Sequence, residues 1–280
     1  MEQNKVKIIV ACHKPVKVYC NSVYTPVHVG RAISDNIEEM KLFQGDDSGD
    51  NISCKNKSYC ELTAQYWAWK NLDCEYIGLC HYRRYFSEEV TVNNIENITR
   101  GFDIVLANKI VLQKSIYRWL LGEFLPEDMY IFITLLKKMY PSNAVEIENY
   151  FMKNNSIHPC NMFLCKKELF DEFAEWQFNF LFELEKFIRF SDYSRPKRIM
   201  GYFGETLLNV FCIIKKLKIK EMPIISMIGD HNTLLQQSSI RKVFNTLDYW
   251  YNCKRDKVDN YAIENGLRAD GIYDALNNWK

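Results

Sequence analysis

Two apolar runs separated by a helical pattern set the strongest limit on how this chain can fold. Residues 5–12 form one run and residues 76–80 form another. Between them, large side chains recur at helical spacing at Leu62, Tyr66 and Trp69. A strand, a helix and a strand joined by a short link indicate parallel strands in an α/β sheet.

The helix between these strands has a recognisable start. Ser58 and Glu61 have the spacing of a capping box, in which a serine side chain and a glutamate three residues later satisfy free backbone amides. We therefore place the start of the helix at Ser58 and its end near Asn71.

The rest of the chain continues this alternation. Further strand-like runs lie at residues 102–106, 160–165 and 219–225. Helical patterns lie at residues 115–150, 169–187 and 204–217. The fold class that follows is α/β: a mixed sheet flanked by helices over residues 1–225, with a helical C-terminal extension over residues 226–280.

Charge and cysteine usage exclude several classes of protein. The chain has 36 Lys and Arg residues against 35 Asp and Glu residues, so its formal charge of +1 argues against a nucleic-acid partner. Its ten cysteines include no C-x-x-C pair, and the first residues show no signal-peptide pattern. We expect free thiols in a reducing cytoplasm and no zinc site.

Familiar nucleotide and hydrolase motifs are absent from the sequence. It contains no G-x-x-x-x-G-K-[ST], G-x-G-x-x-G, H-E-x-x-H or G-x-S-x-G. Support for a P-loop enzyme, a dehydrogenase, a zincin or an α/β-hydrolase is correspondingly weak.

The densest polar cluster comes directly after the second strand, at His81, Tyr82, Arg83 and Arg84. His13 and Lys14 occupy the matching place after the first strand. Ligands of open α/β sheets bind beyond the carboxyl ends of the strands, and paired guanidinium groups suit a diphosphate. The structural alternative is a pair of surface arginines in salt bridges beside a solvated loop.

Three other places could carry chemistry, each with a structural alternative. The turn at residues 46–51 has three carboxylates that could hold a divalent cation, although such a run is more often a hydrated turn. His158 and Asn161 flank the start of a strand, where a lone histidine is more often structural. Glu205 begins an apolar helix, either as an acid favoured by the helix dipole or as a general base.

Four stretches of the sequence resemble one bacterial family. They are residues 49–71, residues 76–86, residues 161–170 and residues 204–210. The family is a domain-of-unknown-function family of capsular and exopolysaccharide gene clusters, regarded as glycosyltransferases. The resemblance spans about Lys7 to Pro223.

This resemblance implies a cytoplasmic glycosyltransferase with a Rossmann-related fold similar to the GT-A type. It would move a hexose, by analogy galactose in pyranose or furanose form, from a UDP-sugar to a lipid-linked glycan in capsule, exopolysaccharide or O-antigen synthesis. Glu205 resembles the base of inverting enzymes. The implied donor site comprises His13, Lys14, Asp50, Asn51, His81, Tyr82, Arg83, Arg84, His158 and Asn161.

One departure from the GT-A pattern concerns the metal. The strand at residues 76–80 lacks the D-x-D that usually binds a cation there. Arg83, Arg84 and Lys14 would then stabilise the leaving group instead of, or alongside, Mn²⁺ or Mg²⁺.

Two competing functions and one further surface stay open. A non-catalytic nucleotide-sugar or glycan-binding module would also suit the aromatic content, whereas a nucleotide-sugar hydrolase lacks a nucleophile or metal cluster. Residues 239–257 mix basic with aromatic side chains, which suits contact with the inner face of the cell membrane. The alternative is a helix packed on its own domain.

Overall fold

The first apolar run forms strand β1 (Val6–Cys12) in the computed structural model, which describes residues 5–228, 231–253 and 260–279. Six of the seven residues of β1 are buried. A strand covered on both faces reads as a continuous apolar run, and β1 lies between β2 (Tyr24–His28) and β4 (Tyr76–His81), parallel to both. The predicted parallel pairing of the first and second apolar runs is confirmed.

The chain divides into two units. Unit 1 comprises Met1–Lys109, His158–Phe178 and Arg198–Gln236. Unit 2 comprises Ile110–Ile157, Asn179–Lys197 and Gln237–Lys280. The predicted division into residues 1–225 and 226–280 stays a prediction.

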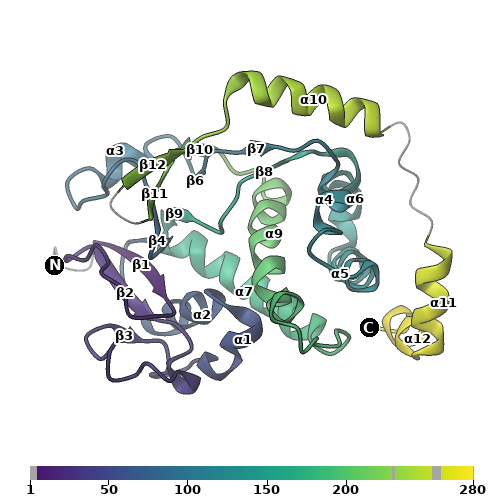
Figure 1. Ribbon diagram of the computed structural model, residues 1–280, viewed down its shortest axis with the longest axis horizontal. Coiled ribbons are helices and arrows are strands. Elements are labelled where there is room, and N and C mark those ends of the chain that lie inside the picture. Colours follow the sequence, from purple (N-terminus) through teal and green to yellow (C-terminus); the bar gives the residue numbers. More distant parts are fainter. Residues whose placement is uncertain (1–4, 229–230, 254–259, 280) are drawn as a thin grey trace. The chain divides into compact units, whose positions relative to one another are not determined.

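The described part of unit 1 contains a ten-stranded mixed sheet (Figure 1). Its remaining strands are β3 (Gln44–Gly45), β5 (Arg84–Phe86), β6 (Ile104–Ala107), β9 (Phe163–Lys166), β10 (Ile219–Met222), β11 (Ile224–Ile228) and β12 (His231–Leu235). The main path runs β10-β6-β9-β4-β1-β2-β3, and β9 is antiparallel to both of its neighbours. Strand β5 folds back on β4 and pairs with β11, which pairs with β12. The predicted α/β class with a mixed sheet is confirmed.

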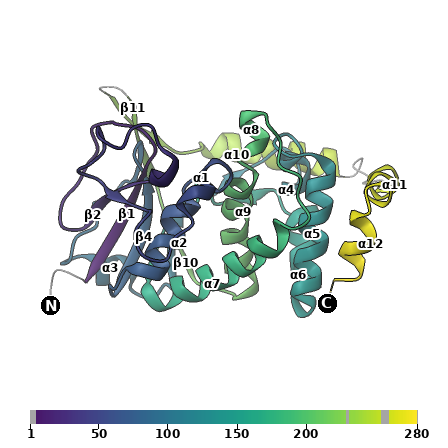
Figure 2. The ribbon, with the colours of Figure 1, turned by 90° about the horizontal axis from the view of Figure 1, so that it is seen from below.

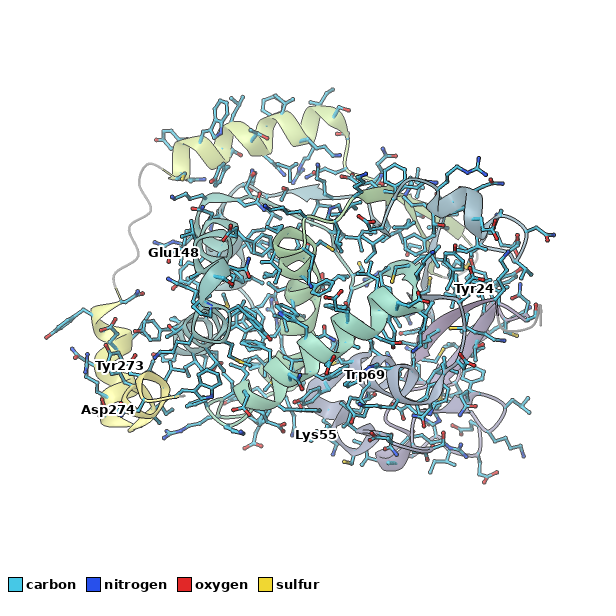
Figure 3. All side chains as sticks on the ribbon, turned by 180° about the vertical axis from the view of Figure 1, so that it is seen from behind. Tyr24, Lys55, Trp69, Glu148, Tyr273 and Asp274 are labelled. Atoms are coloured by element: carbon cyan, nitrogen blue, oxygen red, sulfur yellow. The ribbon has the colours of Figure 1, made fainter. Side chains whose placement is uncertain are left out.

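Helices of unit 1 cover this sheet. They are α1 (Asn56–Tyr59), α2 (Leu62–Asn71), α3 (Ile95–Thr99), α9 (Ile199–Ile214) and the first part of α7 (Lys167–Leu184), with the short 3-10 turns η2 (Arg31–Ile33) and η3 (Ser53–Lys55). Figure 2 shows α1 and α2 beside β1 and β4. Trp69 of α2 stacks on Phe178 of α7, with ring centroids 6.0 Å apart (Figure 3). This aromatic pair joins α2 to α7 in the helical layer of unit 1.

The predicted helix start at Ser58 is wrong. The segment forms α1, breaks at Cys60 with a left-handed φ of 51°, and resumes as α2. The Ser58 hydroxyl donates to the carbonyl of Lys55 instead of capping a helix. The break is stabilised by Asn56, whose side-chain amide donates to the Cys60 carbonyl, and by the close approach of Gly201, where a Cβ atom would lie 3.0 Å from Cys60 Cβ.

Two other boundaries differ from the expectation. The last strand-like run is divided at Pro223 into β10 and β11, because proline lacks the amide needed to continue a ladder. Helix α9 begins at Ile199, five residues earlier than predicted.

Unit 2 is mainly helical. Its elements are β7 (Ile110–Val111), α4 (Ile116–Leu120), α5 (Pro126–Met139), η4 (Pro141–Asn143), α6 (Ala144–Lys153), β8 (Ser156–Ile157), the end of α7, α8 (Ser194–Lys197), α10 (Ser239–Cys253), α11 (Tyr261–Ala269) and α12 (Ile272–Asn277). Strands β7 and β8 form a separate antiparallel pair. Buried Phe132 of α5 lies edge-on to Phe151 of α6 and to Phe180 of α7. Tyr273 of α12 covers the Arg268 guanidinium of α11 at 3.6 Å (Figure 3).

Across the described ranges, no helix is long and apolar enough to pass through a bilayer. Lys254, Arg255 and Lys257, which we expected on a basic C-terminal helix, lie outside the described residues.

The close packing of β4 against β9 predicts that the residue at position 78 has to be glycine. A Cβ atom on Gly78 would lie 2.9 Å from the carbonyl oxygen of Phe163, a backbone atom of the neighbouring strand. Gly78→Ala is therefore expected to lower the free energy of unfolding by about 1–3 kcal/mol, measured by urea titration. Gly266→Ala in α11 is the matched control, since no atom lies within 4 Å of its Cβ position. It is expected to be neutral or to stabilise by roughly 0.5–1 kcal/mol, and equal destabilisation by both variants would contradict the prediction.

Candidate functional site

A cleft of about 640 Å³ lies in unit 1 beyond the carboxyl ends of β1 and β4. Its lining comes from four places: the strand ends (Ala11, His13, His81, Tyr82, Arg83, Arg84), the loop after β2 with the α1–α2 junction (Val29, Asn56, Lys57, Cys60, Glu61), the residue Cys160 before β9, and α9 (Arg198, Gly201, Tyr202, Glu205). This is the position at which open α/β sheets bind ligands, and the volume suits a small-molecule site.

The strand-end wall is built by a tight hairpin. His81 of β4 pairs with Arg84 of β5, so Tyr82 and Arg83 form a two-residue turn at the rim. The Tyr82 amide donates to the carbonyl of Ala11, which ties the turn to β1. The side chains that follow the two parallel strands therefore meet, as their sequence positions predicted.

Tyr82 is the centre of a small cluster at this rim. The His13 ring stands edge-on to Tyr82, with centroids 5.1 Å apart. The Arg83 guanidinium lies 4.9 Å from the Tyr82 ring centroid, and the Lys14 ammonium lies 5.9 Å from it. Partial burial, followed by the charges of Lys14 and Arg198, lowers the pKa of His13 below its ordinary value of 6.5. At neutral pH the ring is therefore an uncharged hydrogen-bonding group beside fixed cations.

One face of α9 forms the opposite wall. Arg198, Gly201, Tyr202 and Glu205 have the spacing i, i+3, i+4 and i+7, so they lie on the same side of the helix. Because α9 begins at Ile199, Glu205 sits in its second turn and not at its start. The expectation that the helix dipole favours this acid is wrong, since that effect fades beyond the first turn.

The junction between α1 and α2 contributes a cysteine that orients a cation. The Arg198 guanidinium donates through Nε to Cys60 Sγ at 3.2 Å. Burial, and next the charge of Glu61, raise the pKa of the Cys60 thiol to about 11. Burial likewise raises the pKa of Cys160 to about 11. Both thiols are protonated at neutral pH and are poorly suited to act as nucleophiles.

The peptide unit of Cys160 connects two sides of the cleft. Its amide donates to Glu205 Oε1 at 2.8 Å, and its carbonyl accepts from His81 Nε2 at 2.6 Å. Since a carbonyl only accepts, His81 carries its proton on Nε2. Cys160 and Asn161 have φ values of 74° and 50°, a left-handed pair that costs non-glycine residues free energy. The two hydrogen bonds hold this strained turn and at the same time position His81 and Glu205.

The charge of the cleft is predominantly positive. Its fixed cations are Lys57, Arg83, Arg84 and Arg198, against the carboxylates of Glu61 and Glu205. The hydrogen bond to Cys60 raises the pKa of the Arg198 guanidinium, and Glu61 is close enough for its charge to help raise it. A cleft lined by four cations and two carboxylates is suited to a multiply charged anion.

Some predicted site residues lie outside the lining. His158 is not a lining residue. Its ring donates through Nδ1 to the Ala107 carbonyl, and its backbone amide donates to the side chain of Asn209. Burial lowers the pKa of His158, which fits a structural histidine. Asn161 is fully buried and its amide nitrogen lies 3.5 Å from Glu61, a lining residue. Lys14 is not a lining residue, but its ammonium group lies near the ring of Tyr82, which is one.

The acidic turn at residues 46–51 does not line the cleft. Buried Asp46 accepts hydrogen bonds from the amides of Gly30 and Arg31 and from the Ser53 hydroxyl. Asp50 accepts from the Tyr66 hydroxyl, and Asn51 donates to backbone carbonyls within the turn. These side chains stabilise a loop and do not converge as oxygen ligands.

Potential metal ligands elsewhere in the described ranges do not converge either. In the ranges that the structure describes, no group of three or more His, Cys, Asp or Glu side chains is arranged to hold a metal ion. The donor set of the cleft, rich in guanidinium groups, does not fit a divalent cation bound by the protein alone.

Sequence reasoning missed several lining residues, chiefly Lys57, Glu61, Arg198 and Tyr202. A signal for two of them was present: Arg198 and Tyr202 precede Glu205 at helical spacing. It was overlooked because the helix was expected to begin only at Gly204. Lys57 and Glu61 lie in a family-like stretch whose local break at Cys60 has no sequence signature.

Comparisons with known proteins agree with one another. A family model described as "Domain of unknown function (DUF4422)" matches residues 7–216. None of the curated proteins matches the chain. Among solved structures, the apo form of the bifunctional glycosyltransferase WbbM is similar, with 30% sequence identity and a TM-score of 0.71. The similarity covers 84% of this chain and 47% of WbbM, so this chain corresponds to about half of that protein.

Proposed function

The chain belongs to the DUF4422 family, and we propose that it is a glycosyltransferase that uses a nucleoside-diphosphate sugar as donor. The observation that carries this proposal is the gathering of Lys57, Arg83, Arg84 and Arg198 in one cleft at the sheet edge where such folds bind ligands. The 30% identity to a bifunctional glycosyltransferase supports the same class of reaction.

The cations suit the diphosphate of the donor. Arg83 and Arg84 come from the β4–β5 hairpin, while Lys57 and Arg198 come from helices on the other side of the cleft. Guanidinium groups bind phosphate oxygens with two parallel hydrogen bonds, and Tyr82 offers a ring for stacking. We assign the diphosphate to this cation cluster and the sugar to the region nearer Glu205.

Glu205 is the proposed general base. Its carboxylate lines the cleft and is oriented by the Cys160 amide. It would take the proton from an acceptor hydroxyl as the hydroxyl oxygen attacks the anomeric carbon. The bond between that carbon and the diphosphate oxygen breaks with inversion, and its electron pair leaves with the nucleoside diphosphate.

The arginines would act on the leaving group. Negative charge grows on the diphosphate as the glycosidic bond breaks, so cations fixed near its oxygens stabilise the transition state more than the ground state. His81 would hold its place at the rim through the Cys160 carbonyl and present its other face to the donor.

The finer assignments extend the same proposal. A UDP-hexose donor, with galactose as the first sugar to test, and a lipid-linked glycan acceptor follow from the family resemblance. So do an inverting outcome, a role in capsule, exopolysaccharide or O-antigen synthesis and a place at the cytoplasmic side of the membrane. GT-A-like topology is proposed on the same basis, together with the parallel strands that end at the cleft.

The base assignment predicts a separation of catalysis from binding. Glu205→Gln removes the proton acceptor but keeps an oxygen for the Cys160 amide. Turnover of a panel of UDP-hexoses, followed by mass spectrometry of the product, is expected to fall by about 10²–10⁴-fold. The UDP affinity measured by calorimetry is expected to change little.

Glu61→Gln is the matched control, because Glu61 is the other carboxylate in the cleft. It is expected to retain most of the turnover. Near-normal turnover of Glu205→Gln, or a collapse confined to Glu61→Gln, would remove Glu205 as the base. UDP binding without any sugar transfer by the unaltered chain would identify a binding module instead of an enzyme.

The cation cluster predicts which arginines matter for the donor. Arg198→Ala removes a cleft guanidinium and is expected to weaken UDP binding by about tenfold, the order expected for one charge-assisted hydrogen bond. Arg195→Ala is the control, since this arginine pairs with Glu123 in unit 2 and does not line the cleft. Equal loss of affinity in the two variants, or none in Arg198→Ala, would contradict the assignment.

A further inference from the structure

Helix α10 is attached to unit 2 by its polar side. The side-chain amide of Asn245 donates to the Val111 carbonyl at 2.6 Å, and that of Asn252 donates to the Gln113 carbonyl at 3.1 Å. The amide of Gln113 in turn donates to Asp248 at 2.9 Å. Asn245, Asp248 and Asn252 follow one face of the helix at i, i+3 and i+7. The polar face of α10 is thus the one fixed along β7 and the residues after it (Figure 1).

The opposite face of α10 is apolar and open to solvent. It consists of Ile240, Val243, Phe244, Leu247, Trp250 and Tyr251, which we call the α10 stripe. Each of these side chains is between 51% and 72% exposed. At 100° per residue they occupy an arc of about 120° along the whole helix. A surface helix normally buries its apolar face, whereas α10 buries Asn245 and Tyr249 and leaves the six apolar side chains of the stripe exposed.

We propose that the α10 stripe rests on the surface of an anionic lipid bilayer. The stripe is the outer face of a helix and is therefore convex, which suits a broad and deformable partner. Phe244, Trp250 and Tyr251 make up half of the stripe, and Trp and Tyr are preferred at the level of lipid headgroups. A helix of 15 residues lying in the plane of the interface buries one face without crossing the bilayer.

Charge on α10 favours an anionic surface. Arg241, four residues before Asn245, lies on the fixed face, and Lys242 lies beside that face, so the helix carries two cations outside the stripe. The single acid among residues 239–253 is Asp248, which lies on the fixed face and accepts from Gln113. The stripe itself carries no charge that would oppose insertion.

A second copy of the chain is the rival partner. Ile240, Val243, Leu247 and Trp250 have heptad spacing, which can form a coiled-coil seam. The stripe is wider than such a seam because Phe244 and Tyr251 extend it to one side. The width, the aromatic content and the excess of basic over acidic side chains on α10 together favour lipid. This inference does not depend on the proposed reaction, since α10 belongs to unit 2 and the cleft to unit 1.

The test is sedimentation of the full chain with vesicles. Phosphatidylcholine vesicles containing phosphatidylglycerol are expected to bind the unaltered chain, while vesicles of phosphatidylcholine alone bind it less. The double variant Leu247→Glu, Trp250→Glu places two carboxylates in the stripe. Its bound fraction is expected to fall by about tenfold or more, because two large apolar side chains no longer insert and two charges face anionic lipid.

Val145→Glu is the matched control, an equally drastic change at a side chain of α6 that is 70% exposed. It is expected to bind vesicles like the unaltered chain. Because Leu247 and Trp250 are exposed, the thermal unfolding of the double variant, followed by circular dichroism, is expected to stay unchanged.

Three outcomes would overturn the proposal. They are vesicle binding by the double variant equal to that of the unaltered chain, no binding to anionic vesicles at all, and equal binding with and without phosphatidylglycerol. If light scattering shows a dimer that the double variant loses, while vesicles capture neither form, the stripe is an interface between copies of this chain.

Discussion

The peptide unit of Cys160 is the connection on which the geometry of the cleft depends. It is held by His81 at the end of β4 on its carbonyl side and by Glu205 of α9 on its amide side. A left-handed backbone at two successive non-glycine residues is unfavourable by itself, so these hydrogen bonds offset its cost. The arrangement explains how a histidine and a carboxylate 124 positions apart are held at fixed places in one site.

The net charge of the whole chain and the charge inside the cleft lead to different conclusions about how an anion would be attracted. A formal charge of +1 provides no long-range field that would attract an anion. The cleft nevertheless gathers Lys57, Arg83, Arg84 and Arg198 from separate elements. Recognition of the proposed donor would therefore arise from short-range, directional contacts, for which arginine is better suited than a diffuse basic surface.

Much of the fold could be predicted from the sequence, because its central strands are continuous apolar runs. The α/β class and the parallel pairing of β1 with β4 followed from the order strand, helix, strand with a short link, and the place of His13 and Tyr82 at the site followed from their positions after these strands. The start of α2 could not be predicted. The left-handed backbone at Cys60 is stabilised by the Asn56 side chain and by the close approach of Gly201 from a distant helix. Lys57 was missed for the same reason, whereas Arg198 was missed because the helix that carries Glu205 was expected to begin at Gly204 and begins at Ile199.

In the proposed reaction, protein cations and not a protein-bound metal hold the donor diphosphate. This proposal rests on the guanidinium-rich lining and on the engagement of the acidic turn in its own loop. The most direct measurement is calorimetric titration of UDP into the full chain in excess EDTA and again with Mn²⁺. UDP is expected to bind in EDTA with an affinity within about tenfold of that in Mn²⁺. Binding that is absent in EDTA and restored by Mn²⁺ would contradict it.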